Sequence, residues 1–438
     1  MTQDRPQVVL QQGGDRRALT GHPWIFSNEL VIDAAARTLP PGEIVTVQRA
    51  DGRALGVGMF NPRSLIAVRM LTRDASRAID EDFLRKRLKR ALKLRDQMIG
   101  APYYRLIHAE ADGLPGCVID RFGDVLVIEP NSAGMDQLTD MLVGVVDRLL
   151  KPKAIVISGD GPARTLEGLS PVHRLAKGEI NGAIAVMEHG AQFLADPTEG
   201  QKTGWFYDQR ENRMLTARFA RDADVLDLYS YSGGFGIQAG RHGAKSVLSV
   251  DRSAPALKLV REAAERNGLS DRLSTEAAEA FDFLDQAAAQ HRTFDLVIAD
   301  PPAFVKSKKD FNQGSRAYRK LARQCASRVR NGGFLFLASC SHHMPPDEFR
   351  AHVARGLHDA GRSGRILFAT GAAPDHPVHP RLPESAYLKA LLLQVDSLSL
   401  YPSCQGLAPA STSFNGARLR RRRQTRGSRP SLGMTNCL

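Results

Sequence analysis

The stretch "DVLDLYSYSGGFGIQAG", residues 224–240, combines an apolar strand pattern, a loop that contains glycine and the start of a helix. We expect the strand to end between Asp227 and Ser230 and the helix to begin near Phe235. In open α/β sheets, ligands bind at the carboxyl ends of the strands, where glycines let backbone N–H groups approach them closely. Taken alone, these glycines are a weak signal, because many βα turns use glycine only for its positive φ.

Strand-like and helix-like runs alternate from about residue 191 onward. After the first strand come the strand-like runs "KSVLSVD", "RLSTEA", "FDLVIAD", "GGFLFLASC" and "RILFAT". Segments of helical length separate them, such as "APALKLVREAAERNG" and "SRAYRKLARQCASRV". The alternation predicts an α/β domain over residues 191–396, with a doubly wound parallel sheet in the strand order 3-2-1-4-5 and helices on both faces. A last run, "AYLKALLLQV", is expected to add an edge strand.

Two smaller domains are expected before this sheet. Residues 1–74 hold short β-like runs between Gly, Pro and Asp-Gly turns, which predict a small β-barrel. Residues 75–190 mix strand signals with a helix near residues 135–150, which predicts a small α+β domain.

A basic amphipathic helix is expected over residues 82–98, "DFLRKRLKRALKLRDQM". Its apolar side is formed by residues at helical spacing: Leu84, Leu88, Ala91 and Leu92. The remaining positions are crowded with cations: Arg85, Lys86, Arg87, Lys89, Arg90, Lys93 and Arg95. This charge is either a solvated helix face or a surface that contacts phosphates.

Composition and length narrow the class of protein. The 438 residues suggest two or three domains, and 42% hydrophobic with 24% charged residues is typical of a globular chain. No export signal and no run of 18 apolar residues is found, so we expect a cytoplasmic protein without a membrane segment. The five cysteines are odd in number and lack CxxC spacing, which argues against a disulfide framework and against a metal site.

The net charge of +13 is concentrated at the end of the sequence. Seven arginines and no acidic residue follow Asp396, which leaves +6 for residues 1–396. A polyanionic partner therefore fits the charge but is not required by it. Residues 397–438 are rich in Ser, Gly, Pro and Arg, and we expect them to be disordered, either as an RNA-binding extension or as an accidental read-through.

A nucleoside cofactor fits the ends of the first three strands of the 191–396 domain. Asp251 ends the second strand, where its carboxylate could accept hydrogen bonds from both hydroxyls of a ribose; the alternative is a cap for the helix that begins at Ser253. Glu279, at the third junction, suits an adenine amino group. NAD and S-adenosylmethionine both fit such a site. Because the loop reads S-Y-S-G-G-F-G rather than G-x-G-x-x-G and offers no evident pyrophosphate site, S-adenosylmethionine is favoured.

The fourth strand ends on Asp300, beside the expected position of a transferable methyl group. Pro301 and Pro302 fix φ and remove two N–H donors, so they hold the loop that carries the Phe304 ring. A flat base with an exocyclic amine would suit this ring and these oxygens. The alternative is a rigid loop that only closes the sheet, with Asp300 as a cap.

Cys340 follows the fifth strand at the same edge of the sheet. It is either a small buried apolar residue or a nucleophile. A thiolate that adds to carbon 6 of cytosine makes carbon 5 nucleophilic enough to take a methyl group, and Asp300 could hold the ring by a hydrogen bond. A base must then remove the proton at carbon 5, and the sequence does not identify that base or the group that activates the thiol.

Several motifs together resemble the large-subunit (23S) ribosomal RNA cytosine-5 methyltransferase I family, over about residues 5–396. The matching stretches are "GHPWIFSNEL", "RLIHAEADGLPGCVIDRFGD", "KTGWFYDQRENR", "DLYSYSGGFG", "DPPAFVKSK" and "SCSHHM". The resemblance implies an N-terminal PUA domain, a central α+β domain and a class I methyltransferase domain with a Rossmann-like fold. It also implies S-adenosylmethionine as methyl donor and large-subunit ribosomal RNA as partner, and leaves open whether two copies form a homodimer.

Residue roles follow from the resemblance at the matching positions. The donor loop would include Asp227, Ser232, Gly233 and Gly234, with Asp251 on the ribose and Glu279 on adenine, although Ala278-Glu279 departs from the commoner Gly-Asp. Asp300 would sit between donor and base, and Cys340 would be the nucleophile. The segment "KTGWFYDQR" would close over the donor, with Arg210 for its carboxylate; a structural segment between domains is the competing interpretation.

Two other functions remain open at this point. RNA guanine methyltransferases also carry Asp-Pro-Pro-aromatic loops but generally lack a cysteine after the fifth strand. A non-catalytic RNA-binding assembly factor would use the barrel domain without the methyl donor.

Overall fold

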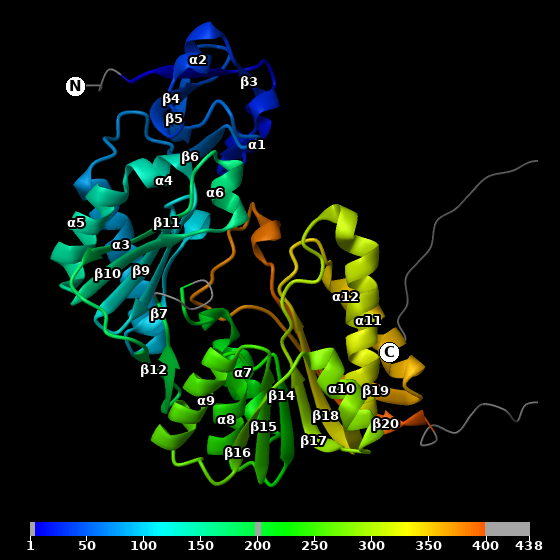
Figure 1. Ribbon diagram of the computed structural model, residues 1–438. Helices are drawn as coiled ribbons and strands as arrows, with labels where there is room; N and C mark the ends of the chain where they lie inside the picture. The colour runs from blue at the N-terminus through cyan, green and yellow to red at the C-terminus, as the bar shows by residue number, and fades with distance from the viewer. Residues whose placement is uncertain (1–4, 198–202, 399–438) are drawn as a thin grey trace, which may run out of the picture. The chain divides into compact units, whose positions relative to one another are not determined.

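The computed structural model describes residues 5–197 and 203–398, which belong to one unit of contacts that ends at Leu398 (Figure 1). The Arg-rich tail expected to be disordered spans residues 397–438, of which 399–438 lie outside the described residues, as does Lys202 of the "KTGWFYDQR" segment. At its start the expectation was wrong, because Ser397 is the last residue of the strand β20 (Lys389–Ser397). None of the described helices is both long enough and apolar enough to cross a membrane.

The N-terminal strands form the expected small barrel-like sheet, in the order β2-β6-β5-β4-β1-β3. Its strands are β1 (Gln7–Leu10), β2 (Trp24–Ile25), β3 (Leu30–Val31), β4 (Glu43–Gln48), β5 (Ala54–Phe60) and β6 (Val68–Thr72), with the short helices α1 (Arg16–Leu19) and α2 (Ala34–Thr38). Alternate residues of β4, such as Val45 and Val47, are fully buried and form a core with Phe60 and Val68.

The central part packs helices on a five-stranded sheet in the order β11-β10-β9-β8-β7. Its strands are β7 (Tyr103–His108), β8 (Cys117–Phe122), β9 (Val125–Pro130), β10 (Ala154–Gly159) and β11 (Val172–Lys177). Its helices are α3 (Glu81–Ile99), α4 (Ala133–Gln137), α5 (Thr139–Leu150) and α6 (Pro162–Leu166). The hairpin of β12 (Ile184–Glu188) and β13 (Ala191–Ala195) follows, before the large sheet.

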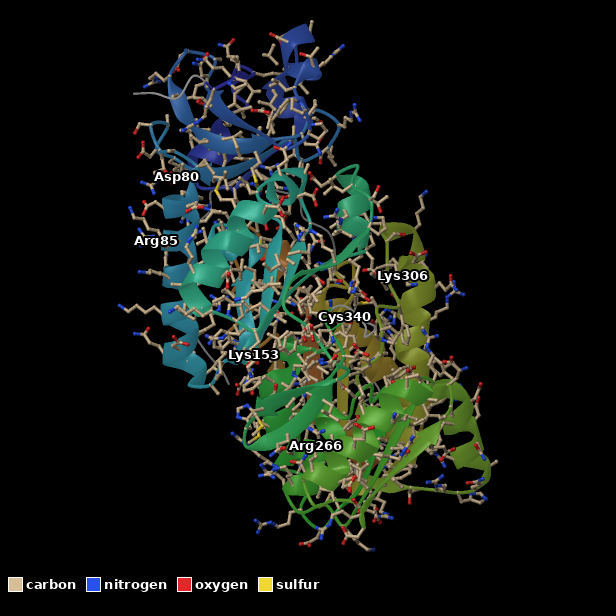
Figure 2. The ribbon with its side chains drawn as sticks, turned by 60° about the vertical axis from the view of Figure 1, so that its left-hand side comes forward. Asp80, Arg85, Lys153, Arg266, Lys306 and Cys340 are labelled. Atoms are coloured by element: carbon tan, nitrogen blue, oxygen red, sulfur yellow. The ribbon has the colours of Figure 1, made fainter. Side chains whose placement is uncertain are left out.

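The expected basic helix is α3, but one of the cations expected on its surface is buried. Leu84, Leu88 and Ala91 are buried as expected, and Figure 2 shows Arg85 on the outward-facing side. Arg95, however, is 0% exposed and binds Asp112 through two N–H groups, at 2.6 and 2.7 Å. Its guanidinium is buried because a carboxylate and two backbone carbonyls satisfy its donors.

The large sheet has the order β16-β15-β14-β17-β18-β20-β19, so its first five strands follow the expected 3-2-1-4-5 order. The strands are β14 (Asp224–Leu228), β15 (Ser246–Asp251), β16 (Leu273–Ala277), β17 (Phe294–Ala299), β18 (Val329–Ser339), β19 (Arg362–Thr370) and β20 (Lys389–Ser397). The helices are α7 (Arg210–Ala217), α8 (Gly234–Arg241), α9 (Ala254–Arg266), α10 (Ala280–Ala289), α11 (Phe311–Arg328) and α12 (Pro346–Asp359).

Helices cover both faces of this sheet, which confirms the predicted α/β class (Figure 1). Along β14, Val225 packs with residues of α8 and α9, whereas Leu226 and Leu228 pack with residues of α10, α11 and α12. Two apolar cores therefore lie back to back on the sheet, and its strand ends form one edge.

The expectation of an edge strand at "AYLKALLLQV" was wrong. This run forms β20, which pairs antiparallel with β18 on one side and with β19 on the other. Its residues are almost all buried, whereas those of β19 are mostly exposed. An almost wholly buried apolar run is typical of an interior strand covered on both faces, and the more exposed β19 takes the edge.

Candidate active site

The ends of three neighbouring strands bring three carboxylates to one edge of the large sheet. Leu228 of β14 pairs with Val250 of β15 and with Ala299 of β17. Asp251 and Asp300 follow these two partners directly, and Asp227 precedes Leu228. The parallel register therefore places the predicted residues Asp227, Asp251 and Asp300 around the loop that leaves β14.

Asp227 is the most buried of the three, at 1% exposed. Its Oδ2 accepts a hydrogen bond from the backbone N–H of Gly236, 2.9 Å away, so it fixes the first turn of α8. Burial raises the pKa of Asp227 to about 8, and the negative charges of Asp300 and Asp251 act in the same direction. A carboxyl that holds its proton near neutral pH can donate one hydrogen bond and accept others.

The loop between β14 and α8 has a strained backbone. Tyr229 and Tyr231 adopt φ values of 58° and 47°, and Gly233, which caps α8, adopts 85°. The left-handed region is costly for residues with a side chain, and such conformations persist where the surroundings impose them, often at functional sites. Gly233 is therefore required by the turn itself.

Two glycines of the motif are required by packing rather than by the turn. A Cβ on Gly234 would lie 2.4 Å from Nε of Arg213. A Cβ on Gly236 would lie 2.6 Å from the Ser249 hydroxyl and 3.0 Å from Oδ2 of Asp227. Both glycines thus have a structural reason, and a direct contact of Gly234 with a cofactor stays a prediction.

Buried hydroxyls in this loop fit a polar ligand. The side-chain oxygens of Ser230 and Ser232 are buried, and neither has a hydrogen-bond partner among the described residues. Buried polar atoms are normally paired, so two orphaned hydroxyls beside a strained loop suit a bound molecule with polar groups. This donor set fits a nucleoside cofactor such as S-adenosylmethionine.

Asp251 and Glu279 differ in the contacts that their carboxylates already make within the protein. Asp251 accepts hydrogen bonds from the backbone N–H of Tyr231 at 2.9 Å and of Ser253 at 2.8 Å. The cap of α9 is the Ser253 hydroxyl, so the alternative role of Asp251 as the cap is wrong. Glu279 is exposed, precedes α10 and lies 3.7 Å from Arg252. Their contacts to a cofactor stay predictions.

The Asp-Pro-Pro loop is held in place by one tyrosine, Tyr318. Asp300 is half-buried, Pro301 is buried and Pro302 is exposed. The Phe304 ring lies 4.8 Å from that of Tyr318, whose hydroxyl also accepts a long hydrogen bond, 3.4 Å, from the Phe304 N–H. The loop is thus held by side-chain contacts in place of a backbone ladder.

Cys340 is half-buried and lies between two serines that bind this same tyrosine. The hydroxyls of Ser339 and Ser341 each lie 2.8 Å from the hydroxyl of Tyr318. Ser341 also accepts a hydrogen bond from the N–H of Val305, at 3.1 Å. The two segments predicted to carry the chemistry, residues 300–305 and 339–341, are therefore joined at the sheet edge.

On its other side Cys340 has neighbours that the sequence analysis missed. It packs against the same core as Tyr387, and its charge acts on Tyr387, Tyr318 and Lys389. The Tyr387 hydroxyl donates a hydrogen bond to Asp208 at 2.5 Å. A signal existed: Tyr387 and Lys389 are polar exceptions in an apolar run, at the end that meets Cys340.

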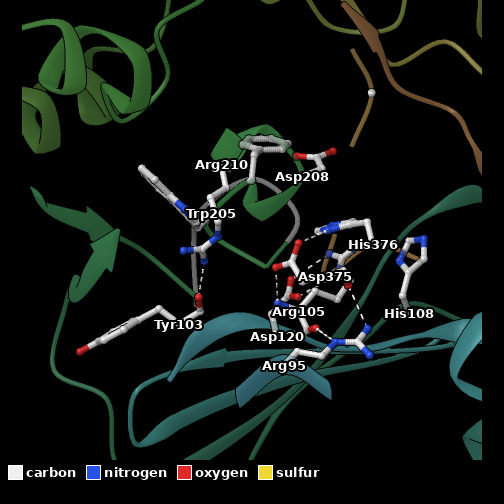
Figure 3. Close-up of polar contacts among 12 residues, drawn as sticks. Arg95, Tyr103, Arg105, His108, Asp120, Trp205, Asp208, Arg210, Asp375 and His376 are labelled. Atoms are coloured by element: carbon white, nitrogen blue, oxygen red, sulfur yellow. Dashed lines mark hydrogen bonds and ion pairs between the residues drawn. The ribbon is translucent and has the colours of Figure 1, made fainter. Parts of the chain in front are cut away.

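Arg210 lies in a buried network that links the central sheet to the part of the chain that holds the large sheet (Figure 3). It donates a hydrogen bond to the carbonyl of Tyr103, and its guanidinium lies over the ring of Tyr207. The Tyr207 hydroxyl in turn binds the carbonyl of Arg121. These contacts match the competing interpretation of a structural segment between domains, and a role for Arg210 at the cofactor stays a prediction.

The comparisons with known proteins agree with this geometry. Residues 8–73 match the model of a PUA-like domain, and residues 170–394 match that of an S-adenosylmethionine-dependent methyltransferase. The chain is 37% identical over 394 residues to the ribosomal RNA large subunit methyltransferase I of Shewanella denitrificans, covering 89% of this chain and 99% of that one. It is 36% identical to the protein of the same name from Alteromonas mediterranea, covering 89% and 98%.

Solved structures show the same fold at low identity. A candidate S-adenosylmethionine-dependent methyltransferase from Streptococcus mutans superimposes with a TM-score of 0.74 at 20% identity, covering 89% of this chain and all of that one. A candidate methyltransferase complexed with SAH gives a TM-score of 0.76, with the same identity and coverage.

Proposed function

Because the chain belongs to the ribosomal RNA large subunit methyltransferase I family, we propose that it methylates carbon 5 of a cytosine in 23S ribosomal RNA through a covalent adduct of Cys340. The chain is an S-adenosylmethionine-dependent methyltransferase with a PUA-like domain. The choice of base and the covalent step are the parts proposed, and the cytoplasm is the compartment that goes with this substrate.

One observation carries the proposal: Cys340 and the Asp300 loop share a single set of hydrogen bonds through Ser341 and Tyr318. A covalent mechanism needs a thiol and a base-holding loop within the length of one pyrimidine ring, and the pairing of β17 with β18, at a strand spacing of about 4.8 Å, supports such an arrangement. A guanine methyltransferase would need the loop but has no use for the thiol.

Each residue of the proposed site has a separate role in the reaction. The thiolate of Cys340 bonds to carbon 6 of the cytosine, which makes carbon 5 nucleophilic. Asp300 accepts a hydrogen bond from the ring, while Pro301, Pro302 and Phe304 form the rim that holds it. S-adenosylmethionine supplies the electrophilic methyl group. Loss of the carbon 5 proton to a base then lets the bond to Cys340 break, which restores the thiolate and the aromatic ring.

The donor would be held by the loop after β14 and the two strand ends beside it. We assign the Ser232 hydroxyl, Gly233, Gly234 and Asp227 to its amino acid part, Asp251 to the ribose and Glu279 to adenine. Arg210 stays the candidate for the donor's carboxylate, because one of its N–H groups binds the carbonyl of Tyr103 while its buried Nε has no hydrogen-bond partner among the described residues.

Cations beside the rim support an RNA substrate. Lys306, Lys308 and Lys309 follow Phe304 and are all exposed, and Figure 2 shows Lys306. Flexible lysines at the mouth of a site suit phosphates whose positions vary.

Mapping the bases of 23S ribosomal RNA from cells that lack this protein tests the proposal. We expect one 5-methylcytosine to disappear and to return with the wild-type gene. Loss of a methylguanine instead would favour the guanine enzyme. Unchanged RNA, together with no S-adenosylmethionine binding in calorimetry, would favour the non-catalytic assembly factor.

A further inference from the structure

Lys389 is a buried cation at the edge of the sheet where Cys340 lies. It is the first residue of β20, it pairs with Ser339 of β18, and it is 7% exposed. Its ammonium donates hydrogen bonds to the carbonyl of Ser341 and, at 2.9 Å, to the carbonyl of Tyr387. Lys389 therefore reaches past Ser339 and binds the backbone on the far side of Cys340.

No described aspartate or glutamate lies within ion-pair distance of this ammonium. A buried ammonium is costly when only neutral carbonyls surround it, so a nearby anion would stabilise it. Burial lowers the pKa of Lys389 to about 8, and the charge of Cys340 acts in the opposite direction. Cys340, whose next residue supplies one of the two carbonyls that the ammonium binds, is thus a neighbour whose ionised thiol would stabilise this lysine.

We propose that Lys389 is a positioning residue that holds a cation beside Cys340 and so stabilises its thiolate. The inference rests on the proposed function for the use that the thiolate serves. Ionisation of the thiol is a separate property, however, and can be measured without any methyl transfer. A neighbouring cation is a known cause of thiolate formation near neutral pH.

The surroundings of Cys340 also contain the titratable side chains of Tyr318, Tyr387 and His342. Tyr318 of α11 and Tyr387 both have a pKa raised by burial, so they stay neutral at neutral pH. Tyr387 binds the carboxylate of Asp208, and the exposed His342 packs on the Tyr387 ring at 5.2 Å.

Two further charged groups belong to the surroundings of the site. Arg105 acts on Tyr387, but its guanidinium binds both oxygens of Asp120, at 2.8 Å each. Asp300 follows the neighbouring strand, and its carboxylate, when ionised, would oppose a thiolate. Lys389 is therefore the group placed to offset this effect.

The pH dependence of alkylation tests the inference on the full-length protein. Iodoacetamide is added between pH 5 and pH 10, and the rate is read by mass spectrometry on the peptide that contains Cys340. We expect a midpoint below the ordinary value of about 8.5 in the wild type. Lys389→Met should raise the midpoint by at least about one pH unit, a tenfold loss of thiolate near pH 7, and Lys389→Arg should leave it nearly unchanged. An unchanged midpoint in Lys389→Met would overturn the inference.

A reciprocal measurement keeps the test decisive if Lys389→Met does not fold. Because coupling between two titrating groups is mutual, Cys340→Ala should lower the pH midpoint for acylation of the Lys389 amine by acetic anhydride. No shift in that variant would refute the coupling. A variant that shows the shift but still methylates RNA would instead refute the covalent mechanism, so the two failures can be told apart.

Discussion

The N–H of Val305 donates a hydrogen bond to the hydroxyl of Ser341, 3.1 Å away, and this bond joins the Asp-Pro-Pro loop to the strand end that bears Cys340. Both prolines lack an N–H, so the loop has few backbone donors with which to join the sheet. Ser341, at 1% exposed, and Tyr318 take over that role. The relative position of the base-holding rim and the thiol thus depends on two side chains.

Ser341→Ala should disturb this position. It leaves the Val305 N–H without its buried partner and removes one of the two serine hydroxyls that bind the Tyr318 hydroxyl, which costs about 1–3 kcal/mol of unfolding free energy. We also expect a lower kcat, measured with labelled methyl donor. Ser327→Ala is the matched control, because that hydroxyl binds only a carbonyl on the exposed side of α11 and its loss should cost less than about 0.5 kcal/mol. Equal stability and activity in both variants would contradict the role of Ser341.

Arg95→Ala should destabilise the protein far more than its place in a basic helix suggests. The change leaves Asp112 buried without its ion pair and strips the carbonyls of Arg105 and Asp375, at a cost of about 3–5 kcal/mol. Arg90→Ala, on the exposed side of the same helix, should change the unfolding free energy by less than about 0.5 kcal/mol. Urea titration compares the two, and similar losses would show that Arg95 has no special structural role.

The free energy of unfolding should depend on pH through the titration of Asp227. Its pKa is raised from 3.8 to about 8 in the folded state, so the folded protein binds more protons than the unfolded chain between these values. This carboxyl's contribution to stability therefore falls as pH rises from about 4 to about 8.

Asp227→Asn removes that titration and keeps an oxygen for the Gly236 N–H. We expect its unfolding free energy to exceed that of the wild type at pH 8 by at least about 1 kcal/mol, with the difference shrinking toward pH 5. Asp347→Asn, at a highly exposed position, is the control and should follow the wild type at both pH values. Parallel curves for wild type and Asp227→Asn would mean that the carboxyl is ionised in the folded state.

Local patterns predicted the sheet well, and long-range pairing limited the rest. The βα alternation was sufficient for the order of the first five strands, because right-handed crossovers leave few alternatives. The place of β20 was missed because a strand's neighbours depend on which partner covers its apolar residues. Arg95 was missed because it was grouped with the surface cations by residue type, although it follows Leu88 by seven positions and Ala91 by four and so shares their buried side. Its partner Asp112 comes from a different segment, so the ion pair that permits this burial could not be predicted.

In the candidate site, too, some residues could be placed from the sequence and others could not. Asp227, Asp251, Asp300 and Cys340 could be placed at one edge, because each follows or ends a strand. Lys389 could not, because its ammonium reaches Ser341 only through the antiparallel pairing of β20 with β18. The orphaned hydroxyls of Ser230 and Ser232 likewise depend on burial that the sequence does not encode locally.

A covalent bond between Cys340 and cytosine is the central claim, and RNA that contains 5-fluorocytosine tests it most directly. Fluorine at carbon 5 blocks the final loss of the proton, so the adduct cannot break down after methyl transfer. We predict a protein–RNA adduct that survives denaturing electrophoresis for the wild type and for Cys325→Ala, whose thiol is fully buried in α11. Cys340→Ala should give no adduct and no 5-methylcytosine. An adduct, or full methylation, with Cys340→Ala would contradict the account.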